Sequence, residues 1–194
     1  MPKHLPTILK TSEINALLLA ARDAADRAKT PSKQLGAWRD FSMIQTALLS
    51  GGRLAELCDL KIPNVDLAGA VINIIEGKGS KDRNVPIGKK LMPVLREWIG
   101  ERKDGWLFPG PKGKHLSKRT FQLRLETLAT AAGIAKGIHP HLMRHVFACE
   151  LLRTGALLTE VQELLGHANL ATTAIYLHVD TTRLKPAVDR LFVR

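Results

Sequence analysis

The sequence has little cysteine and no long apolar run. Its two cysteines, Cys58 and Cys149, lie far apart in the chain, and neither belongs to a C-x-x-C pair. This pattern excludes a disulfide scaffold and a cysteine-built zinc site, and it suits a reducing compartment. No apolar stretch reaches the roughly 18 residues of a membrane span, and the first residues lead into no signal-peptide core. We therefore expect a soluble, cytoplasmic protein with no membrane partner.

The charge of the chain is one-sided. It has 29 Lys and Arg residues against 18 Asp and Glu residues, for a formal net charge of +11. Such a positive potential attracts polyanions and favours nucleic acid as the partner. Aromatic residues make up 5% of the chain and include a single tyrosine, Tyr176, which is poor material for stacking single-stranded bases. Charge alone also fits a ribosome-associated protein or a merely soluble basic domain. If the partner is nucleic acid, the low aromatic content favours a double-stranded target.

At 194 residues the chain can form one domain with its own core. Runs rich in Val and Ile predict strands within 65–75 and at 83–87, joined by a glycine-containing loop. Apolar residues at the helical period predict helices from residue 11, with Thr11 or Ser12 as N-cap, and over 35–49, 53–60, 89–102, 117–132, 141–154, 159–165, 170–178 and 184–192. Helices around one three-stranded antiparallel insertion describe an α+β fold that is mainly helical.

The first segment with chemical character is L-S-G-G-R-L-A-E-L at residues 49–57. Arg53 opens a helix after two glycines, where backbone N–H groups and the helix dipole favour an anion. Its guanidinium offers a fork of donors that fits two phosphate oxygens. Glu56, one helical turn on, could hold that guanidinium in place. For this segment alone, a surface Arg–Glu pair is an equally good interpretation.

The second segment is the hairpin E-G-K-G-S-K-D-R at residues 76–83. Glycines on both sides of Lys78 let the loop approach a ligand closely, and a lysine there can reach into a cleft. The segment is not a Walker loop, because no Ser or Thr follows the lysine directly. We expect Lys81 and Arg83 to contact backbone phosphates. Without other evidence, a solvated basic turn is the favoured interpretation of this hairpin.

The third segment, H-P-H-L-M-R-H at residues 139–145, begins a helix. His141 and Arg144 are three residues apart and share one face, so a group that titrates near neutral pH lies beside a permanent cation. His141 and His145 also have the spacing of a zinc helix. However, Leu142 stands where the metalloprotease motif has its Glu, and we therefore expect no metal.

The fourth segment, L-L-G-H-A-N-L-A-T-T-A-I-Y at residues 164–176, contains His167 and ends at Tyr176. Taken alone, Tyr176 would be an ordinary core aromatic. Together with the other segments it suggests chemistry on a phosphodiester, in which guanidinium groups neutralise the charge of the transition state. A histidine would take the proton of the attacking phenol, and Lys78 would protonate the departing sugar oxygen. Acidic residues show no metal-binding spacing, so no cofactor is expected.

In this order, the four segments resemble the catalytic domain of the tyrosine recombinases, the phage integrase or Xer-like family of site-specific DNA recombinases. The resemblance covers roughly residues 11–192. It implies the fold of that domain, with Tyr176 as the nucleophile that forms a 3′-phosphotyrosyl bond and Lys78 as the general acid. It places around the scissile phosphate Arg53, His141, Arg144 and His167. Glu56 and His145 are expected to support the site.

The resemblance also implies an organisation and partners. We expect an extended arm at 1–10, a catalytic domain at 11–179, and a tail helix at 180–194 that packs on a neighbouring protomer. The N-terminal core-binding domain of most relatives is expected to be absent, which would weaken duplex binding. The expected partner is double-stranded DNA with a specific recombination site, bound by a tetramer that is monomeric without DNA. No ATP is needed, and accessory DNA-bending or directionality proteins and a nucleoid location fit this function.

Further candidates for DNA contact lie where a basic loop enters a helix, although a solvated helix end explains each of them equally well. These residues are Lys112, Lys114, Lys118, Arg119 and Arg124. Two alternative functions stay open at this point. A type IB topoisomerase uses similar residues, but the L-L-G-H and T-T-x-x-Y spacing argues against it. A non-catalytic DNA-binding regulator on the same fold is disfavoured, because no catalytic position is substituted.

Overall fold

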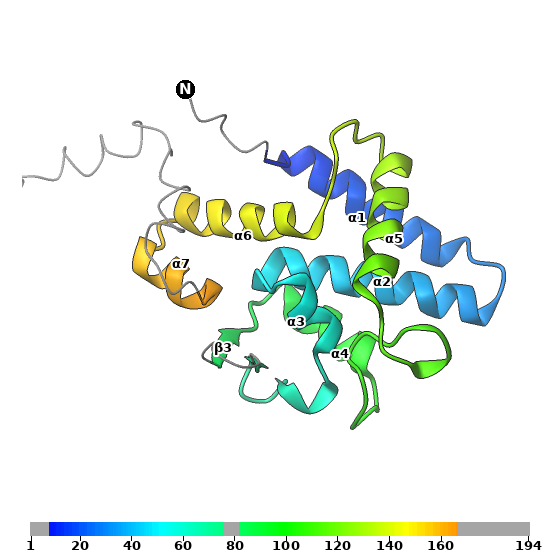
Figure 1. Ribbon diagram of the computed structural model, residues 1–194, viewed down its shortest axis with the longest axis horizontal. Helices are drawn as coiled ribbons and strands as arrows, with labels where there is room; N and C mark the ends of the chain where they lie inside the picture. Colours follow the sequence, from blue (N-terminus) through cyan, green and yellow to red (C-terminus); the bar gives the residue numbers. More distant parts are fainter. Residues whose placement is uncertain (1–7, 76–81, 167–194) are drawn as a thin grey trace, which may run out of the picture.

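The computed structural model describes residues 8–75 and 82–166, and its helices surround the long helix α2 (Figure 1). Helices α1, α3, α4, α5 and α6 all contact α2, while α7 packs against α6 and β3. The helices are α1 (Thr11–Asp26), α2 (Pro31–Ser50), α3 (Leu54–Asp59), α4 (Leu91–Ile99), α5 (Lys118–Ala131), α6 (Pro140–Thr154) and α7 (Leu158–Leu165), with short 3-10 turns η1 (Ile62–Asn64) and η2 (Pro111–Gly113). The mainly helical α+β fold predicted from the sequence is confirmed.

A small antiparallel sheet of order β1-β2-β3 lies at one edge of the helices. Its strands are β1 (Val65–Asp66), β2 (Val71–Ile74) and β3 (Arg83–Pro86). The run predicted at 65–75 is therefore two strands, because the chain turns between them and Ala70 adopts a positive φ of 54°. In the register of β2 and β3, Ile72 lies opposite Val85 and Ile74 opposite Arg83. The three-stranded antiparallel sheet is confirmed.

Local side-chain chemistry sets where several helices begin. Thr30 caps α2 by accepting a hydrogen bond from the backbone N–H of Lys33 at 3.4 Å, so this helix begins before the predicted residue 35. Ser117 caps α5 in the same way, with the N–H of Thr120 at 3.0 Å. Helix α1 differs from the prediction: its N-cap is Lys10, whose N–H donates to the Glu13 carboxylate.

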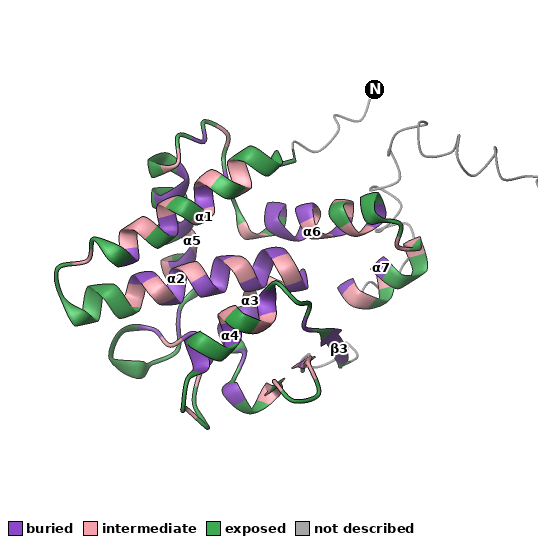
Figure 2. Ribbon diagram, turned by 180° about the vertical axis from the view of Figure 1, so that it is seen from behind, coloured by how far each residue is buried: buried purple, intermediate pink, exposed green. Residues whose placement is uncertain are grey.

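The apolar core has two parts of very different size. Among the described residues, the main cluster contains 31 buried apolar side chains and joins the helices around α2 to the sheet. A separate cluster of four, Ala148, Leu152, Val161 and Leu165, holds α7 against α6. Figure 2 shows the buried positions concentrated along α2 and on the inward sides of its neighbours. Of the helices in the described ranges, none combines the length and the apolar character needed to span a membrane.

Several predicted elements lie outside the described residues. These are the helices expected at 170–178 and 184–192, the tail at 180–194 and most of the arm at 1–10. From that arm the structure describes residues 8–10, with Leu9 buried in the main core.

Candidate active site

A sharp turn after α2 places the first site residue. Gly51 ends α2 in the left-handed conformation, with φ 64°, and a Cβ at this position would overlap the ring of Phe147. Glycine is therefore needed here both for the backbone conformation and for the close approach of α6. The chain reverses direction and presents Arg53 as the N-cap of the short helix α3.

Glu56 links two arginines from different elements. It accepts hydrogen bonds from Arg53, at 2.7 Å from Nη1 and 2.6 Å from the backbone N–H. It also accepts hydrogen bonds from both terminal nitrogens of Arg83 on β3, at 3.0 Å from Nη1 and 2.7 Å from Nη2. The side chain of Glu56 is 8% exposed and that of Arg83 is 7% exposed, whereas Arg53 keeps 38% of its surface in solvent. Two cations therefore share one buried carboxylate.

The sequence predicts a phosphate contact for Arg83, whereas the structure places its side chain in the interior beside Glu56. Along β3 buried and exposed positions alternate, so Arg83 lies on the same inward face as Val85. Its guanidinium is buried and donates to both oxygens of Glu56. Arg83 belongs to the interior of the site.

The end of α7 is the meeting point of three arginines. Arg83 donates from Nε to the carbonyl of Leu164 at 2.9 Å, Arg144 donates from Nη2 to the next carbonyl, that of Leu165, and Arg53 donates from Nη2 to the carbonyl of Gly166 at 3.1 Å. The last carbonyls of a helix lack partners within it and carry the negative end of the helix dipole. Cations are therefore stabilised at this point.

Arg144 is the most deeply buried of these cations. It is 2% exposed, and its Nη1 also donates to the carbonyl of Gly51 at 2.6 Å. Its guanidinium thus joins the turn after α2 to the end of α7, which lie more than a hundred residues apart in the sequence. Arg53 and Arg144 are brought together at consecutive carbonyls, in an arrangement that two phosphate oxygens could face.

The electrostatics of the site favour a charged carboxylate. Burial alone would raise the pKa of Glu56, but hydrogen bonds from Arg83 and from the backbone of Arg53, with the positive charges of both, outweigh it and lower the pKa below its usual value. Glu56 is therefore ionised at neutral pH and offsets part of the positive charge of the two arginines.

The histidines at the start of α6 form a cluster of rings. His139 caps the helix, because its Nδ1 accepts a hydrogen bond from the backbone N–H of Leu142. The rings of His141 and His145 pack edge to face, with their centroids 4.5 Å apart. His141 is exposed as a residue, but partial desolvation of its ring and the nearby charges of Arg144 and His139 lower its pKa. Burial, with His141, His139 and Arg144 beside it, lowers the pKa of His145 to about 4. Both rings favour the neutral form, which can accept a proton.

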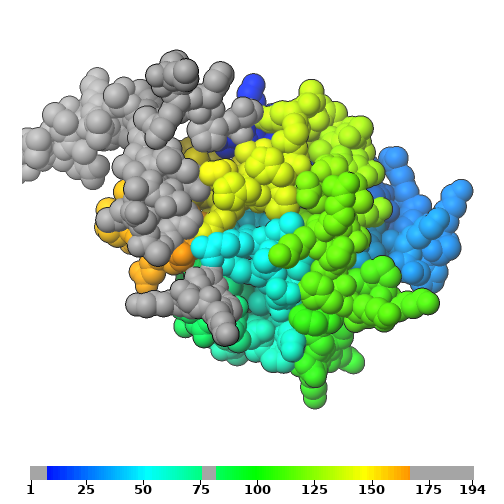
Figure 3. All heavy atoms as spheres, in the orientation of Figure 1, coloured from blue at the N-terminus to red at the C-terminus, as the bar shows by residue number. Residues whose placement is uncertain are grey.

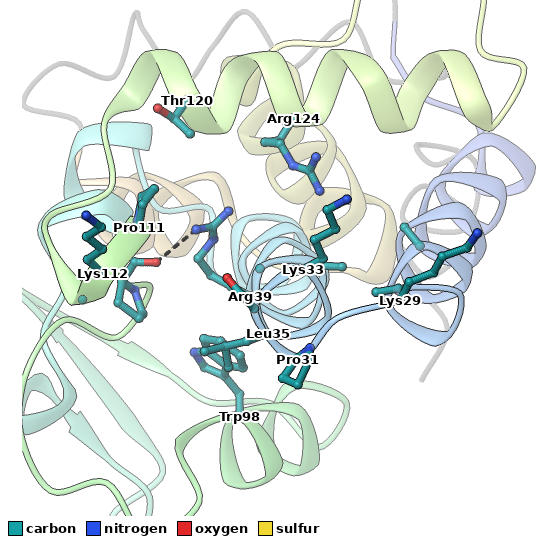
Figure 4. Close-up of a pocket in the computed structure, with 18 of the residues that line it drawn as sticks. Lys29, Pro31, Lys33, Leu35, Arg39, Trp98, Pro111, Lys112, Thr120 and Arg124 are labelled. Atoms are coloured by element: carbon teal, nitrogen blue, oxygen red, sulfur yellow. Dashed lines mark hydrogen bonds between the residues drawn. The ribbon is translucent and has the colours of Figure 1, made fainter.

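The remaining predicted site residues fall into two groups. Four of them, Lys78, Lys81, His167 and Tyr176, lie outside the described residues. The five candidates for DNA contact are all exposed, and two of them, Lys112 and Arg124, line a hollow of about 1070 Å³ between α2, η2 and α5 (Figure 4). Further cations line the same hollow, namely Arg27, Lys29, Lys33 and Arg39. In the view of Figure 3, α3, α5 and α6 form one continuous face.

Sequence reasoning missed two features of this region. Asp40 is buried and pairs with Arg39 at 2.6 Å and with Arg124 at 2.7 Å, which ties one DNA-contact candidate to the interior. The second missed feature is the set of carbonyls at 164–166, because backbone groups leave no mark in a residue pattern. A signal for the inward Arg83 was present in the alternation of Arg83, Val85 and Ile87. In the described ranges, no three His, Cys, Asp or Glu side chains come together as a metal site.

The chain is similar to known proteins over most of its length. Residues 8–183 match the phage integrase family. The tyrosine recombinase XerC of Xanthomonas axonopodis pv. citri is 39% identical over 191 residues, which cover 97% of this chain and 59% of that protein. The crystal structure of XerA recombinase is similar over 100% of this chain and 66% of its own, with a TM-score of 0.79 and 30% identity.

A second solved structure is of XerH site-specific recombinase bound to difH substrate, in a pre-cleavage complex. It covers 100% of this chain and 56% of its own, with a TM-score of 0.75 and 30% identity. This chain spans less than two thirds of the length of the XerC relative described above. The match to the family covers most of its residues, and the chain belongs to the phage integrase family of tyrosine recombinases.

Proposed function

We propose that this chain is the catalytic domain of a site-specific recombinase that cleaves and rejoins duplex DNA through Tyr176. The observation that carries the proposal is the convergence of Arg53 and Arg144 on consecutive carbonyls at the end of α7. His167 follows directly after Gly166, the residue that ends α7, and Tyr176 comes nine residues later. Membership of the phage integrase family supports the same assignment.

In the proposed reaction, the Tyr176 oxygen attacks the phosphorus and the 5′-oxygen of the DNA leaves. A phenol has a reference pKa of about 10, so a histidine must take its proton as the bond forms. The leaving oxygen receives a proton from Lys78 and departs as a 5′-hydroxyl, while the 3′-phosphate stays bound to the tyrosine. Attack by the 5′-hydroxyl of another strand reverses these steps. One phosphodiester is exchanged for another, so no ATP is needed, and the guanidinium groups supply the positive charge that a metal ion could otherwise supply.

The two guanidinium groups supply the electrostatic part of this reaction. The pentacoordinate transition state has more negative charge on its non-bridging oxygens than the ground state has. Fixed cations stabilise that added charge without reorganising. Arg144 is held from two sides, by the carbonyls of Gly51 and Leu165, and Arg53 is held by Glu56 and Gly166. Such fixed positions suit a phosphate whose oxygens must be met in one geometry.

The proposed substrate is a duplex with a specific recombination site. The net charge of +11 and the basic hollow beside α5 support a polyanionic partner. We further propose a tetramer on DNA and a monomer without it, with residues 180–194 as the segment that packs on a neighbouring protomer. Accessory proteins and association with the nucleoid follow from the same function.

A covalent trapping experiment tests this proposal. The protein is incubated with a pool of short duplexes that have a random centre and one nick, so that cleavage releases a small fragment and traps the protein on DNA. We expect an adduct that survives SDS, with one sequence enriched after repeated selection, and none with Tyr176→Phe. An adduct that persists in Tyr176→Phe would overturn the assignment of the nucleophile.

The same preparation separates the alternative functions. Relaxation of a supercoiled plasmid that lacks the selected sequence, at the rate seen with a plasmid that contains it, would indicate a type IB topoisomerase. Tight duplex binding without adduct on any member of the pool would indicate a DNA-binding regulator instead.

A further inference from the structure

Arg83 makes contacts that none of the reaction steps above requires. It heads β3, at the end of the hairpin segment 76–83, and is nearly buried. Its guanidinium uses both terminal nitrogens on the two oxygens of Glu56 and its Nε on the carbonyl of Leu164. A single side chain therefore joins three parts of the chain, namely β3, α3 and the end of α7.

The contact with α7 matters because, within the described residues, few fully buried apolar side chains hold that helix. Its apolar packing on α6 relies on a cluster of four buried residues, against 31 in the main core of the described chain. A helix with so little apolar burial opens locally at low cost unless directional contacts hold it. The arginines on the carbonyls at 164–166 are such contacts, and Arg83 is the one that reaches furthest back into the helix.

Gly166 shows that the fit at this point is tight. It adopts φ 64° and ψ 42°, and it ends α7. A Cβ at this position would lie 3.1 Å from Cδ and 3.2 Å from Nη1 of Arg83. The chain thus leaves α7 in a direction set by a left-handed glycine that lies against the Arg83 side chain.

We propose that Arg83 is a positioning residue, which together with Gly166 holds the end of α7 in register with Arg53 and Arg144. It acts through Glu56 and the Leu164 carbonyl and does not touch DNA. Its loss would let the residue that follows Gly166 shift relative to the two guanidinium groups. A displacement of about 1 Å at a reaction centre can lower a rate by about 100-fold. This inference rests on the proposed function for its effect on cleavage, but the local effect on α7 does not.

The test compares Arg83→Lys with a matched control, Arg102→Lys. Arg102 also donates to the last carbonyls of a helix, those of Trp98 at 2.5 Å and Ile99 at 3.2 Å, but it does so on α4. A lysine keeps the charge but cannot span a carboxylate and a carbonyl at once. For Arg83→Lys we expect faster amide hydrogen exchange over 158–166. For Arg102→Lys, exchange over the same residues should stay as in the wild type.

Cleavage supplies the functional readout. At saturating protein, Arg83→Lys should lower the rate constant of adduct formation by about 10- to 100-fold. The Kd for the duplex should change less than about threefold, and its salt dependence should keep the wild-type slope, because no phosphate contact is lost. Guanidinium ion added to Arg83→Ala should restore part of the rate. Arg102→Lys should match the wild type in all of these measurements.

Other outcomes have distinct meanings. A shallower salt slope with a weaker Kd would show that Arg83 binds phosphate, and would overturn the proposal. Unchanged exchange over 158–166 would overturn it as well, whatever happens to cleavage. If the wild type forms no adduct, the proposed function fails, while hydrogen exchange still decides whether Arg83 holds α7. Gly166→Ala provides a second variant, for which we expect the same local loosening and slow cleavage with α1 to α5 still protected.

Discussion

The main core and the attachment of α7 are built in different ways. Around α2, 31 buried apolar side chains hold the described helices and the sheet together. Four buried side chains, with partly buried neighbours, hold α7 on α6, and three guanidinium groups bind consecutive carbonyls at its end. Apolar burial is strong but nondirectional, whereas a charge-assisted hydrogen bond fixes a distance and an angle. The first suits a scaffold, and the second suits a place where phosphate must be met in one geometry.

The comparison predicts that stability and chemistry can be changed separately. Changes in the main core should unfold the whole domain. Changes in the arginine network should alter cleavage and local opening far more than global unfolding.

Phe121→Ala should cause the largest loss of stability. Phe121 is fully buried on α5 within the main core, and truncating a buried phenylalanine costs about 3–5 kcal/mol. Urea unfolding followed by circular dichroism should show this loss in a single transition. Leu165→Ala, in the small cluster, is the matched change, and we expect it to loosen α7 with a smaller shift of the main transition. Equal shifts for the two variants would contradict the comparison.

Glu56→Gln should have the next largest effect. It removes the carboxylate shared by Arg53 and Arg83, and leaving a buried cation without its partner costs about 3 kcal/mol. The pKa of Glu56 is lowered in the folded protein, so the stability from this group is present above its unfolded pKa and is lost as the pH falls through the folded value. The variant should therefore lose part of the acid destabilisation of the wild type. Glu150→Gln, which breaks an exposed pair with Arg153, should leave both the free energy of unfolding and its dependence on acid pH unchanged.

A smaller effect is expected from the pH dependence of His145. Burial lowers its pKa to about 4, so between about pH 6.5 and pH 4 the unfolded chain binds a proton that the folded chain does not. Stability should fall as the pH decreases through this window, by about 2 kcal/mol for a partly buried ring. His145→Phe keeps a ring that cannot be protonated, and its stability should vary less over the same range. A variant with the full wild-type slope would show that another group causes it.

Much of this fold could be predicted from the sequence, because apolar periodicity and capping residues act locally. The period of Phe41, Ile44 and Leu48 indicated α2, and the Val- and Ile-rich runs indicated the sheet. The place of the turn within 65–75 was not predicted, since Ala70 is not a residue typical of positive φ. Side-chain motifs pointed to Arg53, Glu56 and Arg144, which the structure brings together.

The missed features of the site depend on tertiary structure. The basic hairpin predicts a phosphate contact for Arg83, but strand alternation turns the side chain inward onto Glu56. The carbonyls at 164–166 become acceptors only where α7 ends and three distant arginines arrive. Such acceptors belong to the backbone, and no residue pattern reports them. The roles assigned to the predicted site residues stay predictions, and Lys78, His167 and Tyr176 lie outside the described residues.

The most direct test of the central claim is to identify the residue that becomes linked to DNA. The trapped adduct can be digested with protease and nuclease, and the nucleotide-bearing peptide sequenced by mass spectrometry. We predict a phosphodiester on Tyr176 with a 3′-linked nucleotide, formed by the wild type and strongly reduced in Arg144→Lys. A nucleotide on any other residue, or an adduct of unchanged yield and rate in Arg144→Lys, would contradict the claim that the arginines at the end of α7 serve a tyrosine nucleophile.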